Sequence, residues 1–244
     1  MRVLIILAFL SIKVMTDEFF YFIPPKNWAL VDPKKLPSST TIAFVCKLGA
    51  AIKPSINLGI EPTDLSLENY LKIAKKKILL DRRNSWKELC YLKTPMGEAR
   101  ISQIEQKHEC GDLISMQYIL IAQKKAFVIT ALCLKDDYPT FSQDFLKTFE
   151  SFQLTQNALA SLQEVKDQKA LLSLQTKITD DWKKHVQSSK KESKETLFNS
   201  KTFQKKFWQP LEAEISKSFK DKGLFWQSQT AHEIKASLKT SFDN

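Results

Sequence analysis

The order of apolar and polar residues in the first third of the chain predicts an amphipathic helix that packs on a sheet. After Pro62, apolar residues recur at helical spacing, and lysines fall on the opposite side of the helix. The apolar stripe consists of Leu67, Leu71, Ala74 and Ile78. Thr63 or Asp64 is the expected N-cap, because a short oxygen-bearing side chain can accept a backbone N–H of the first turn.

Short apolar or alternating runs predict strands on both sides of this helix. Before it the runs lie at 19–23, 41–48 and 55–60, and after it at 86–92, 98–106, 113–122 and 126–134. Tight turns join the later runs, which predicts an antiparallel meander. A second helix over 138–152 carries Phe141, Phe145, Phe149 and Phe152 on one face. The sequence therefore predicts an α+β fold, with an antiparallel sheet of six or seven strands sandwiched by helices.

Strand signals disappear after about residue 155, and helical spacing replaces them. In 157–187 the expected apolar positions are Leu159, Leu162, Val165, Leu172, Ile178, Trp182 and Val186. In 197–222 they are Phe203, Phe207, Leu211, Ile215 and Phe219, and near the end Ile234, Leu238 and Phe242. Pro210 either kinks its helix or lies in the first turn of a new one. We expect a sandwich domain over 19–154 and an α-helical module of three or four helices over 156–244.

Composition permits a packed core and does not favour nucleic acid as the partner. Hydrophobic residues make up 43% of the chain and aromatic residues 11%, which is typical of a globular protein. The net charge is +10, but arginine, whose planar fork suits bases and phosphates, occurs at four positions: Arg2, Arg82, Arg83 and Arg100. Lysines also alternate with acids, as in residues 190–195. We interpret the lysines as a solvated surface, with nucleic-acid binding as an alternative.

The N-terminal residues allow three interpretations. Residues 1–12 (MRVLIILAFLSI) place a ten-residue apolar run after one basic residue, a length that suits an export signal and is short for a membrane span. Lys13 follows directly, and no small-x-small cleavage site comes after it. A signal peptide over 1–15 predicts a periplasmic or secreted protein. An uncleaved segment predicts an envelope-associated protein, and a start at Met15 predicts a cytoplasmic one.

The four cysteines, Cys46, Cys90, Cys110 and Cys133, form no CxxC pair. Cys46 and Cys133 lie within apolar runs, where a free cysteine behaves as a small hydrophobic residue. Cys90 and Cys110 flank a predicted hairpin, so a disulfide between them remains an alternative. We expect reduced thiols.

Known catalytic and cofactor motifs are absent from the sequence. There is no GxGxxG, no GxxxxGK followed by Ser or Thr, no GxSxG and no HExxH. The His/Cys cluster at residues 108–110 (His-Glu-Cys) lacks further ligands at a recognised spacing, so we expect a polar hairpin turn there.

Two cysteine–histidine pairs and two pairs of adjacent carboxylates are the remaining candidates for chemistry. Cys90 with His108, or Cys110 with His185, would need an oriented third group for nucleophilic catalysis. Residues 136–137 and 180–181 are aspartate pairs, which more often favour a helix start than acid–base catalysis. We therefore predict no catalytic, cofactor-binding or metal-binding residues, and a protein that is not an enzyme.

The first part of the chain resembles the PsbP-like superfamily. The matching segments are the aromatic strand that leads into FIPPKNW (22–28), SINLGI (55–60), SLENYLKIAKKKIL (66–79), the meander through TPMGEAR (94–100) and DFLKTFESF (144–152). This superfamily also includes DcrB-type lipoproteins, effector chaperones of bacterial secretion systems and a Ran-binding nuclear import factor. The resemblance covers residues 19–154. It implies helices on both faces of the sheet and a role as adaptor, chaperone or assembly factor, without carrying over any site residue.

Aromatic residues of the helical module are the candidate partner-binding residues: Phe203, Phe207, Trp208, Phe219, Phe225 and Trp226. Either they form the core of a bundle or they line a groove for an apolar or amphipathic helix of another protein. Lysines alternate with aromatics over 201–208, which is also compatible with stacking on single-stranded nucleic acid. We expect a non-enzymatic protein-binding or assembly-type protein. Any contact with a membrane would be made through the N-terminal segment.

Overall fold

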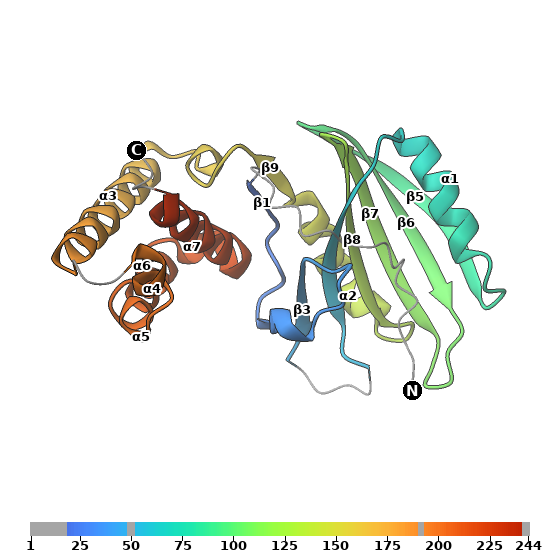
Figure 1. Cartoon of the computed structure of the whole chain (residues 1–244). Coiled ribbons are helices and arrows are strands. Elements are labelled where there is room, and N and C mark those ends of the chain that lie inside the picture. The colour runs from blue at the N-terminus through green and yellow to red at the C-terminus, as the bar shows by residue number, and fades with distance from the viewer. Residues whose placement is uncertain (1–18, 48–51, 190–192, 241–244) are drawn as a thin grey trace. The chain divides into compact units, whose positions relative to one another are not determined.

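The computed structural model describes residues 19–47, 52–189 and 193–240, and these divide into two compact units (Figure 1). The sandwich unit consists of Pro24–Glu150. The helical unit combines the described residues before Pro24 with those from Ser151 onward. In sequence, the sandwich unit is therefore inserted between two pieces of the helical unit.

The sandwich unit contains a seven-stranded antiparallel sheet in the order β2-β3-β4-β8-β7-β6-β5. Its strands are β2 (Trp28–Leu30), β3 (Ile42–Cys46), β4 (Ser55–Pro62), β5 (Asn84–Thr94), β6 (Gly97–Gln106), β7 (Leu113–Ala122) and β8 (Lys125–Leu134). The last four form the predicted meander. A short 3₁₀ turn (Pro33–Lys35) follows β2. The α+β class, the strand number and the C-terminal helical region predicted from the sequence are confirmed.

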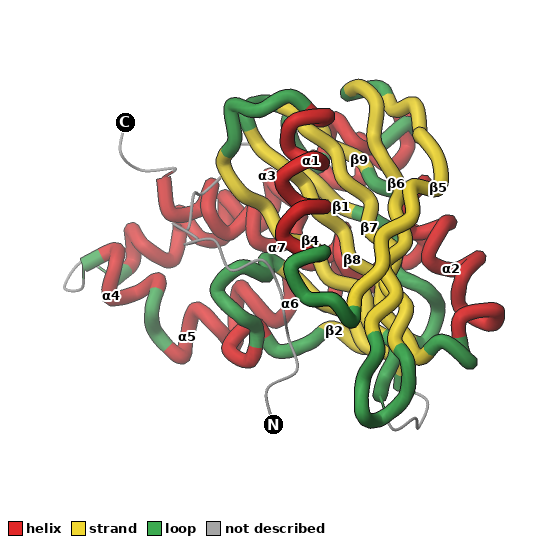
Figure 2. The backbone as a smooth tube through the Cα atoms, turned by 90° about the vertical axis from the view of Figure 1, so that its right-hand side faces the viewer, coloured by secondary structure: helices red, strands yellow, loops and turns green. Residues whose placement is uncertain are grey.

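Helix α1 (Leu67–Ile78) covers one face of this sheet (Figure 2). It buries Tyr70, Leu71 and Ala74 against Ile119 of β7 and Ala126 of β8. Because successive strand residues point to opposite faces, the odd residues of β7 and the even residues of β8 define the α1 face. The predicted amphipathic helix is thus present, and its lysines are exposed.

The N-cap of α1 is Ser66, and the prediction of Thr63 or Asp64 was wrong. The Ser66 hydroxyl accepts the backbone N–H of Asn69. Thr63 instead accepts the N–H of Leu65 within the loop. Several oxygen-bearing side chains in a row can each cap a turn, so composition alone does not select among them.

Helix α2 (Tyr138–Glu150) covers the opposite face and closes the larger core. Phe145 and Phe149 are fully buried, and the Phe149 ring centroid lies 5.8 Å from that of Tyr118 on β7. Trp28 of β2 contacts Phe145 edge to face at 6.3 Å. Aromatic pairs of this geometry add about 0.5–1.5 kcal/mol each to the burial of their area.

The helical unit starts with a two-stranded sheet, in which β1 (Phe19–Tyr21) pairs with β9 (Gln153–Thr155). The expectation that 19–23 joins the sheet of the sandwich was wrong: β2, which the sequence did not predict as a strand, takes the seventh place. The α-helices are α3 (Val165–Ser188), α4 (Lys194–Phe198), α5 (Lys201–Phe203), α6 (Gln209–Ser218) and α7 (Gly223–Thr240). Short turns precede α3 (Leu159–Ser161), α6 (Gln204–Trp208, π-helical) and α7 (Lys220–Lys222).

Strand β1 belongs to the core of the helical unit because its aromatic side chains pack on α7. The Phe19 ring lies 6.2 Å from Trp226, and Phe22 lies 4.9 Å from Phe225. Both Phe22 and Phe225 are fully buried. An aromatic run predicts a strand, but it does not reveal which partner the strand will find.

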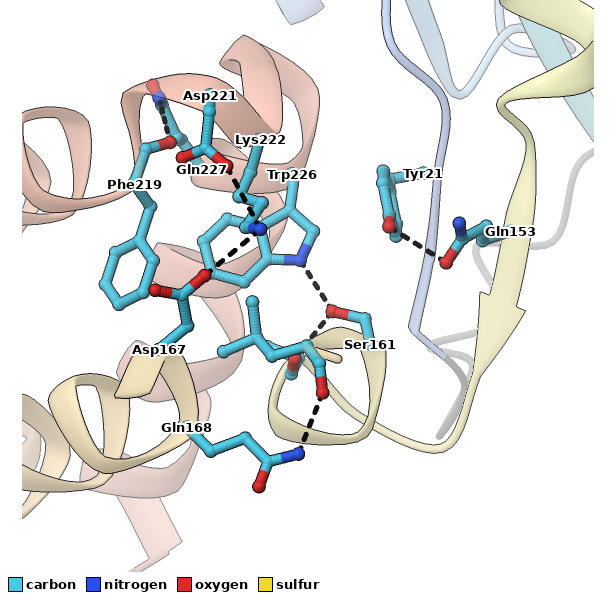
Figure 3. Close-up of polar contacts among 12 residues, drawn as sticks. Tyr21, Gln153, Ser161, Asp167, Gln168, Phe219, Asp221, Lys222, Trp226 and Gln227 are labelled. Carbon is cyan, nitrogen blue, oxygen red and sulfur yellow. Dashed lines mark hydrogen bonds and ion pairs between the residues drawn. The ribbon is translucent and has the colours of Figure 1, made fainter. Parts of the chain in front are cut away.

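Polar contacts join the pieces of the helical unit (Figure 3). The Tyr21 hydroxyl donates to Gln153 Oε1 at 2.9 Å, and the indole N–H of the buried Trp226 donates to Ser161 Oγ at 2.7 Å. Lys222 Nζ lies 3.1 Å from a carboxylate oxygen of Asp167 and 3.0 Å from one of Asp221. These contacts join β1 to β9, the turn before α3 to α7, and α3 to the turn before α7.

Two predictions about helix register have clear outcomes. Pro210 is the second residue of α6, but α6 continues the π-helical segment Gln204–Trp208 without a break, so Pro210 lies inside a continuous helical run and not at the start of a new helix. In α3 the buried residues are Leu171, Ile178 and Trp182, whereas Val165 and Leu172 are exposed. The expected stripe was wrong at those two positions, because with adjacent leucines at 171 and 172 the spacing fits either residue.

The predictions for the chain termini fall on residues that the structure does not describe. These are the signal peptide over 1–15, the alternative start at Met15 and the apolar position Phe242. Within the described residues, no helix is long and apolar enough to cross a membrane.

Candidate functional site

Strand β5 forms one edge of the sheet, and within the described part of the chain it pairs with β6 alone. With eleven residues, it is the longest strand of this sheet. An edge strand presents backbone N–H and C=O groups on its outer side, where another extended chain can pair with them. The opposite edge, β2, has three residues and offers a much shorter template.

A β-bulge at Leu89 divides β5 into two regular stretches. Glu88 lies opposite Ser102, and Cys90 lies opposite Ile101, so Leu89 has no residue across from it. A bulge of this kind shifts the alternation of side chains by one residue and redirects those that follow. Leu89 itself is about one-third exposed at the edge of the sheet.

The shift places Glu88 and Tyr91 on the same face of the sheet, although they are three residues apart. Tyr91 lies opposite Arg100, which in turn lies opposite Ile119 of the α1 face. Glu88 lies opposite Ser102 on that same face. Without the bulge, Glu88 and Tyr91 would point to opposite faces.

A pocket of about 420 Å³ lies at the bulge. It is lined by Glu88, Leu89, Cys90, Tyr91 and Arg100. It is a shallow depression that is open to solvent, with room for a side chain of a bound segment rather than an enclosed ligand cavity.

Arg100 forms the floor of this pocket and is held by several partners. Its guanidinium carbon lies 3.4 Å from the centroid of the Tyr91 ring. Its nitrogens lie 3.3 Å from a carboxylate oxygen of Glu88 and 3.4 Å from one of Glu98. Lys75 of α1 lies 3.8 Å from Glu88 as well. Two cations and two carboxylates thus balance, so the pocket carries no surplus charge for a charged ligand.

The sheet beside the pocket carries a row of polar side chains across neighbouring strands. Glu88, Ser102, Gln117 and Thr130 lie opposite one another in turn, from β5 to β8. Gln117 Nε2 is 3.5 Å from Thr130 Oγ1, and the hydroxyl of the fully buried Ser102 has no hydrogen-bond partner among the described residues. An unsatisfied buried hydroxyl costs about 1–3 kcal/mol.

Nucleophilic catalysis at Cys90 finds no support in the geometry. Cys90 lies opposite Ile101, while His108 comes after the end of β6, so the two are separated by about 20 Å of extended strand. The same separation rules out a bridge between Cys90 and Cys110, since disulfides need Cα atoms within about 7 Å. None of the four cysteines is bridged to another in the structure.

The structure does not bring the remaining candidates for chemistry together within one unit. Cys110 and His185 belong to different units. The backbone N–H of Cys110 donates to His108 Nδ1 at 3.1 Å, within the turn that was predicted there. No group of three or more histidine, cysteine or acidic residues suited to a metal ion occurs in the described residues.

The six aromatic residues expected to bind a partner are all buried in the helical unit: Phe203, Phe207, Trp208, Phe219, Phe225 and Trp226. Phe203 and Phe207 pack at 5.1 and 5.2 Å against Trp182, and Phe219 packs at 5.1 Å against Trp226. A partner could reach these rings only if helices separated. Their role in partner binding stays a prediction. The exposed candidate site lies instead at β5, a strand that the sequence pattern did not single out as a binding site.

Comparisons with known proteins show similarity to solved structures alone. No protein-family model matches the chain. No curated protein matches it. LpqN of Mycobacterium tuberculosis, described as involved in cell envelope biogenesis, is 15% identical, with 57% of this chain and 84% of that chain covered and a TM-score of 0.43. The cyanobacterial PsbP (CyanoP) of Synechocystis is 11% identical, with 60% and 98% covered and a TM-score of 0.42.

A third similar structure is PA94 of Pseudomonas aeruginosa, a protein of unknown function. It is 12% identical, with 51% of this chain and 95% of that chain covered and a TM-score of 0.40. A PsbP protein thus stands among the similar structures, as the sequence resemblance predicted. At these identities and TM-scores the likeness says nothing about the function of this chain.

Proposed function

We propose that this chain is a non-enzymatic binding protein, and that β5 receives an extended segment of another polypeptide as an additional strand. The observation that supports this most is the open edge of β5 beside the pocket at Leu89. In strand addition, backbone hydrogen bonds provide affinity and side-chain pockets provide specificity. At β5 the open strand edge and the side-chain pocket lie next to each other.

Backbone hydrogen bonds alone are too weak to account for micromolar binding, so the pocket has to contribute to the affinity. Pairing with half of β5 would form four or five hydrogen bonds at about 1 kcal/mol each. Micromolar binding corresponds to about 8 kcal/mol, and ordering the segment has its own cost. Burying a large apolar side chain adds about 2–3 kcal/mol. We therefore expect the partner segment to place an apolar or aromatic side chain between Leu89 and Tyr91.

The charged residues of β5 account for selectivity rather than affinity. Lys87 and Lys93 are exposed and flank the bulge. Lysines and bulges on an edge strand discourage pairing with a second copy of the same strand. A partner segment with acidic residues at the matching positions would avoid this repulsion.

Selection of peptides tests the proposal, and it does so whatever the identity of the partner. A library of random twelve-residue peptides is selected against the whole chain, and the affinities of the recovered peptides are measured for two variants. Leu89→Lys places a charge at the pocket. Leu30→Lys makes the same change on β2, the other edge of the sheet, where the leucine is similarly exposed (39% against 36%).

We expect the recovered peptides to bind the Leu89→Lys variant at least tenfold more weakly and the Leu30→Lys variant within twofold of the original chain. Equal affinities for all three proteins, or the recovery of no binding peptide, would contradict strand addition at β5.

We also propose export, with the apolar run of residues 1–12 as the signal. The run has the length of a signal-peptide core. Mass spectrometry of the mature protein tests this: cleavage near residue 15 supports export, and an intact start at Met1 or Met15 contradicts it.

A further inference from the structure

The outer face of α1 combines lysines with exposed aliphatic side chains. Tyr70, Leu71 and Ala74 face the sheet, so Lys72, Lys76 and the residues one turn further face away from it. Ile73, in the same turn as Lys72, is 45% exposed. Figure 2 shows this helix in front of the sheet, with its outer side uncovered by the rest of the sandwich unit.

Two exposed leucines extend this face at the C-terminal end of the helix. Leu79 is 42% exposed and Leu80 is 75% exposed, the largest value among the exposed large hydrophobic residues. Single exposed leucines are common, but here two adjacent ones follow exposed Ile73 by about two helical turns, so apolar side chains occur at both ends of this face.

The loop that carries these leucines is held in place by its own polar groups. Arg83 Nη2 donates to Asp81 at 2.7 Å, and the backbone N–H of Arg83 also donates to Asp81 at 3.0 Å. Asn84 Nδ2 donates to the carbonyl of Ile78 at 3.0 Å. The leucines are therefore presented on an ordered turn, which reduces the entropy lost when they become buried.

Positive charge is concentrated in the same part of the chain. Residues 67–94 contain eight lysines or arginines and three acidic residues, so they hold five of the ten net positive charges in the whole chain. On α1 itself the acidic residue is Glu68, at the end remote from the leucines. Near the leucine end, Asp81 is paired with Arg83, and Glu88 of β5 is paired with Arg100 and Lys75.

We propose that the outer face of α1 and the Leu79–Leu80 turn dock on the surface of an anionic lipid bilayer. In this arrangement Leu79 and Leu80 would enter the interfacial region, while Lys72 and Lys76 stay at the level of the lipid phosphates. Lysine suits this role because a diffuse negative surface needs point charges rather than the planar fork of arginine. The contact is peripheral, since the apolar stripe of α1 remains packed on the sheet.

A lipid surface fits these features better than an acidic protein does. An acidic segment would be attracted by the lysines but would gain little from two exposed leucines in a turn. A bilayer uses both, because basic residues add about 1 kcal/mol each near an anionic surface and the leucines add burial of apolar area.

Vesicle sedimentation of the whole chain tests this proposal. The probes are vesicles of phosphatidylglycerol and phosphatidylcholine and vesicles of phosphatidylcholine alone, at about 100 mM salt. One variant, Lys72→Gln with Lys76→Gln, removes charge, and another, Leu79→Ser with Leu80→Ser, removes apolar area. The matched control is Lys183→Gln with Lys184→Gln, which makes the same charge change at exposed positions on α3.

We expect binding to the anionic vesicles and at least tenfold weaker binding to phosphatidylcholine. The lysine variant should lower the partition coefficient by about 25-fold, from about fivefold per charge. The leucine variant should lower it about tenfold. The α3 control should change it by less than twofold. Far-UV circular dichroism of each variant establishes that it is folded, which these exposed positions lead us to expect.

Three results would overturn the proposal. The first is no preference for anionic vesicles. The second is an equal loss of binding in the α3 control, which would indicate attraction by net charge alone. The third is a leucine variant that binds as well as the original chain while polyglutamate competes fully with the vesicles, which would indicate an acidic protein partner instead.

Discussion

The guanidinium of Arg100 stacks on the ring of Tyr91, with 3.4 Å between the central carbon and the ring centroid. The two residues lie opposite each other on β6 and β5. Stacking keeps the aromatic ring over the pocket and leaves its outer face exposed to solvent. This pair therefore connects the stability of the sheet edge with the shape of the proposed binding site.

Replacing Tyr91 by Ser should lower both the stability of the sheet edge and the affinity of the proposed site for peptides. Loss of the cation–π contact at a partly exposed site should lower the free energy of unfolding by about 0.5–1 kcal/mol. Affinity for selected peptides should fall at least tenfold, since one wall of the pocket is removed. Tyr91→Phe is the control and should keep both values. Urea unfolding and peptide titration measure them, and a Tyr91→Ser variant with unchanged peptide affinity would speak against the pocket.

The four thiols should react at two different rates. Cys90 and Cys110 are exposed, whereas Cys46 and Cys133 are buried. Burial raises the pKa of Cys133 to about 12, which suppresses the reactive thiolate at neutral pH. Alkylation followed by peptide mass spectrometry should therefore label Cys90 and Cys110 first.

A peptide bound at β5 should slow the alkylation of Cys90 severalfold and leave Cys110 unchanged, because Cys90 lines the pocket. Cys110, in the turn before β7, serves as the internal control. Slowing at both residues or at neither would place the peptide elsewhere.

Replacing Phe22 by Ala should unfold the helical unit before the sandwich unit. Phe22 is fully buried and contacts Phe225 of α7. Truncating a buried phenylalanine typically costs about 3–5 kcal/mol. All four cysteines lie in the sandwich unit, so the protection of Cys46 and Cys133 reports on that unit alone.

In a urea titration of this variant, we expect helical circular dichroism to fall at lower urea than the protection of these thiols does. Loss of both signals at one lower midpoint would show that the two units unfold together. Residues 24–150 expressed alone provide a further control, and the thiols should be protected there as well.

Stability of the helical unit should decrease as the pH rises through the range in which Glu233 ionises. Burial raises the pKa of Glu233, although the backbone N–H of Ala158 donates to its carboxylate at 2.8 Å and partly offsets this. An acid with a raised pKa in the folded state binds more protons there than in the unfolded chain. The free energy of unfolding therefore falls as the pH increases from the ordinary pKa of glutamate, 4.5, through the raised value.

Glu233→Gln keeps the hydrogen-bond acceptor and removes the charge. The variant should match the original chain near pH 4 and be the more stable of the two at pH 7. Thermal unfolding of both proteins across this range measures the difference, and parallel pH profiles would contradict the assignment.

Sequence patterns predicted most of the sheet because the meander has regular alternation and short turns. They failed at three kinds of position, each for a physical reason. The aromatic strand at 19–23 found its partner in β9, more than a hundred residues away, and no local pattern contains that information. The bulge at Leu89 breaks the period on which strand prediction depends. The register of α3 was ambiguous at Leu171 and Leu172.

The candidate site could not be predicted for the same reasons. Its residues come from an irregular stretch of β5 and from Arg100 on the next strand, and the bulge is what brings Glu88 and Tyr91 to one face. Aromatic residues of the helical module stand out in the sequence because they are numerous. Their burial shows that here the aromatic stripe at helical spacing marks a core and not an open surface.

Amide hydrogen exchange with a selected peptide bound gives the most direct test of strand addition. Backbone amides of β5 that point away from β6 exchange with solvent in the free protein and should slow markedly, at alternate residues, when a peptide pairs with them. Amides of β2, at the other edge, should be unaffected. Slowing at alternate residues on at least one side of the bulge at Leu89 is the predicted result, and a bound peptide that leaves the amides of Asn84–Thr94 unchanged would contradict the account.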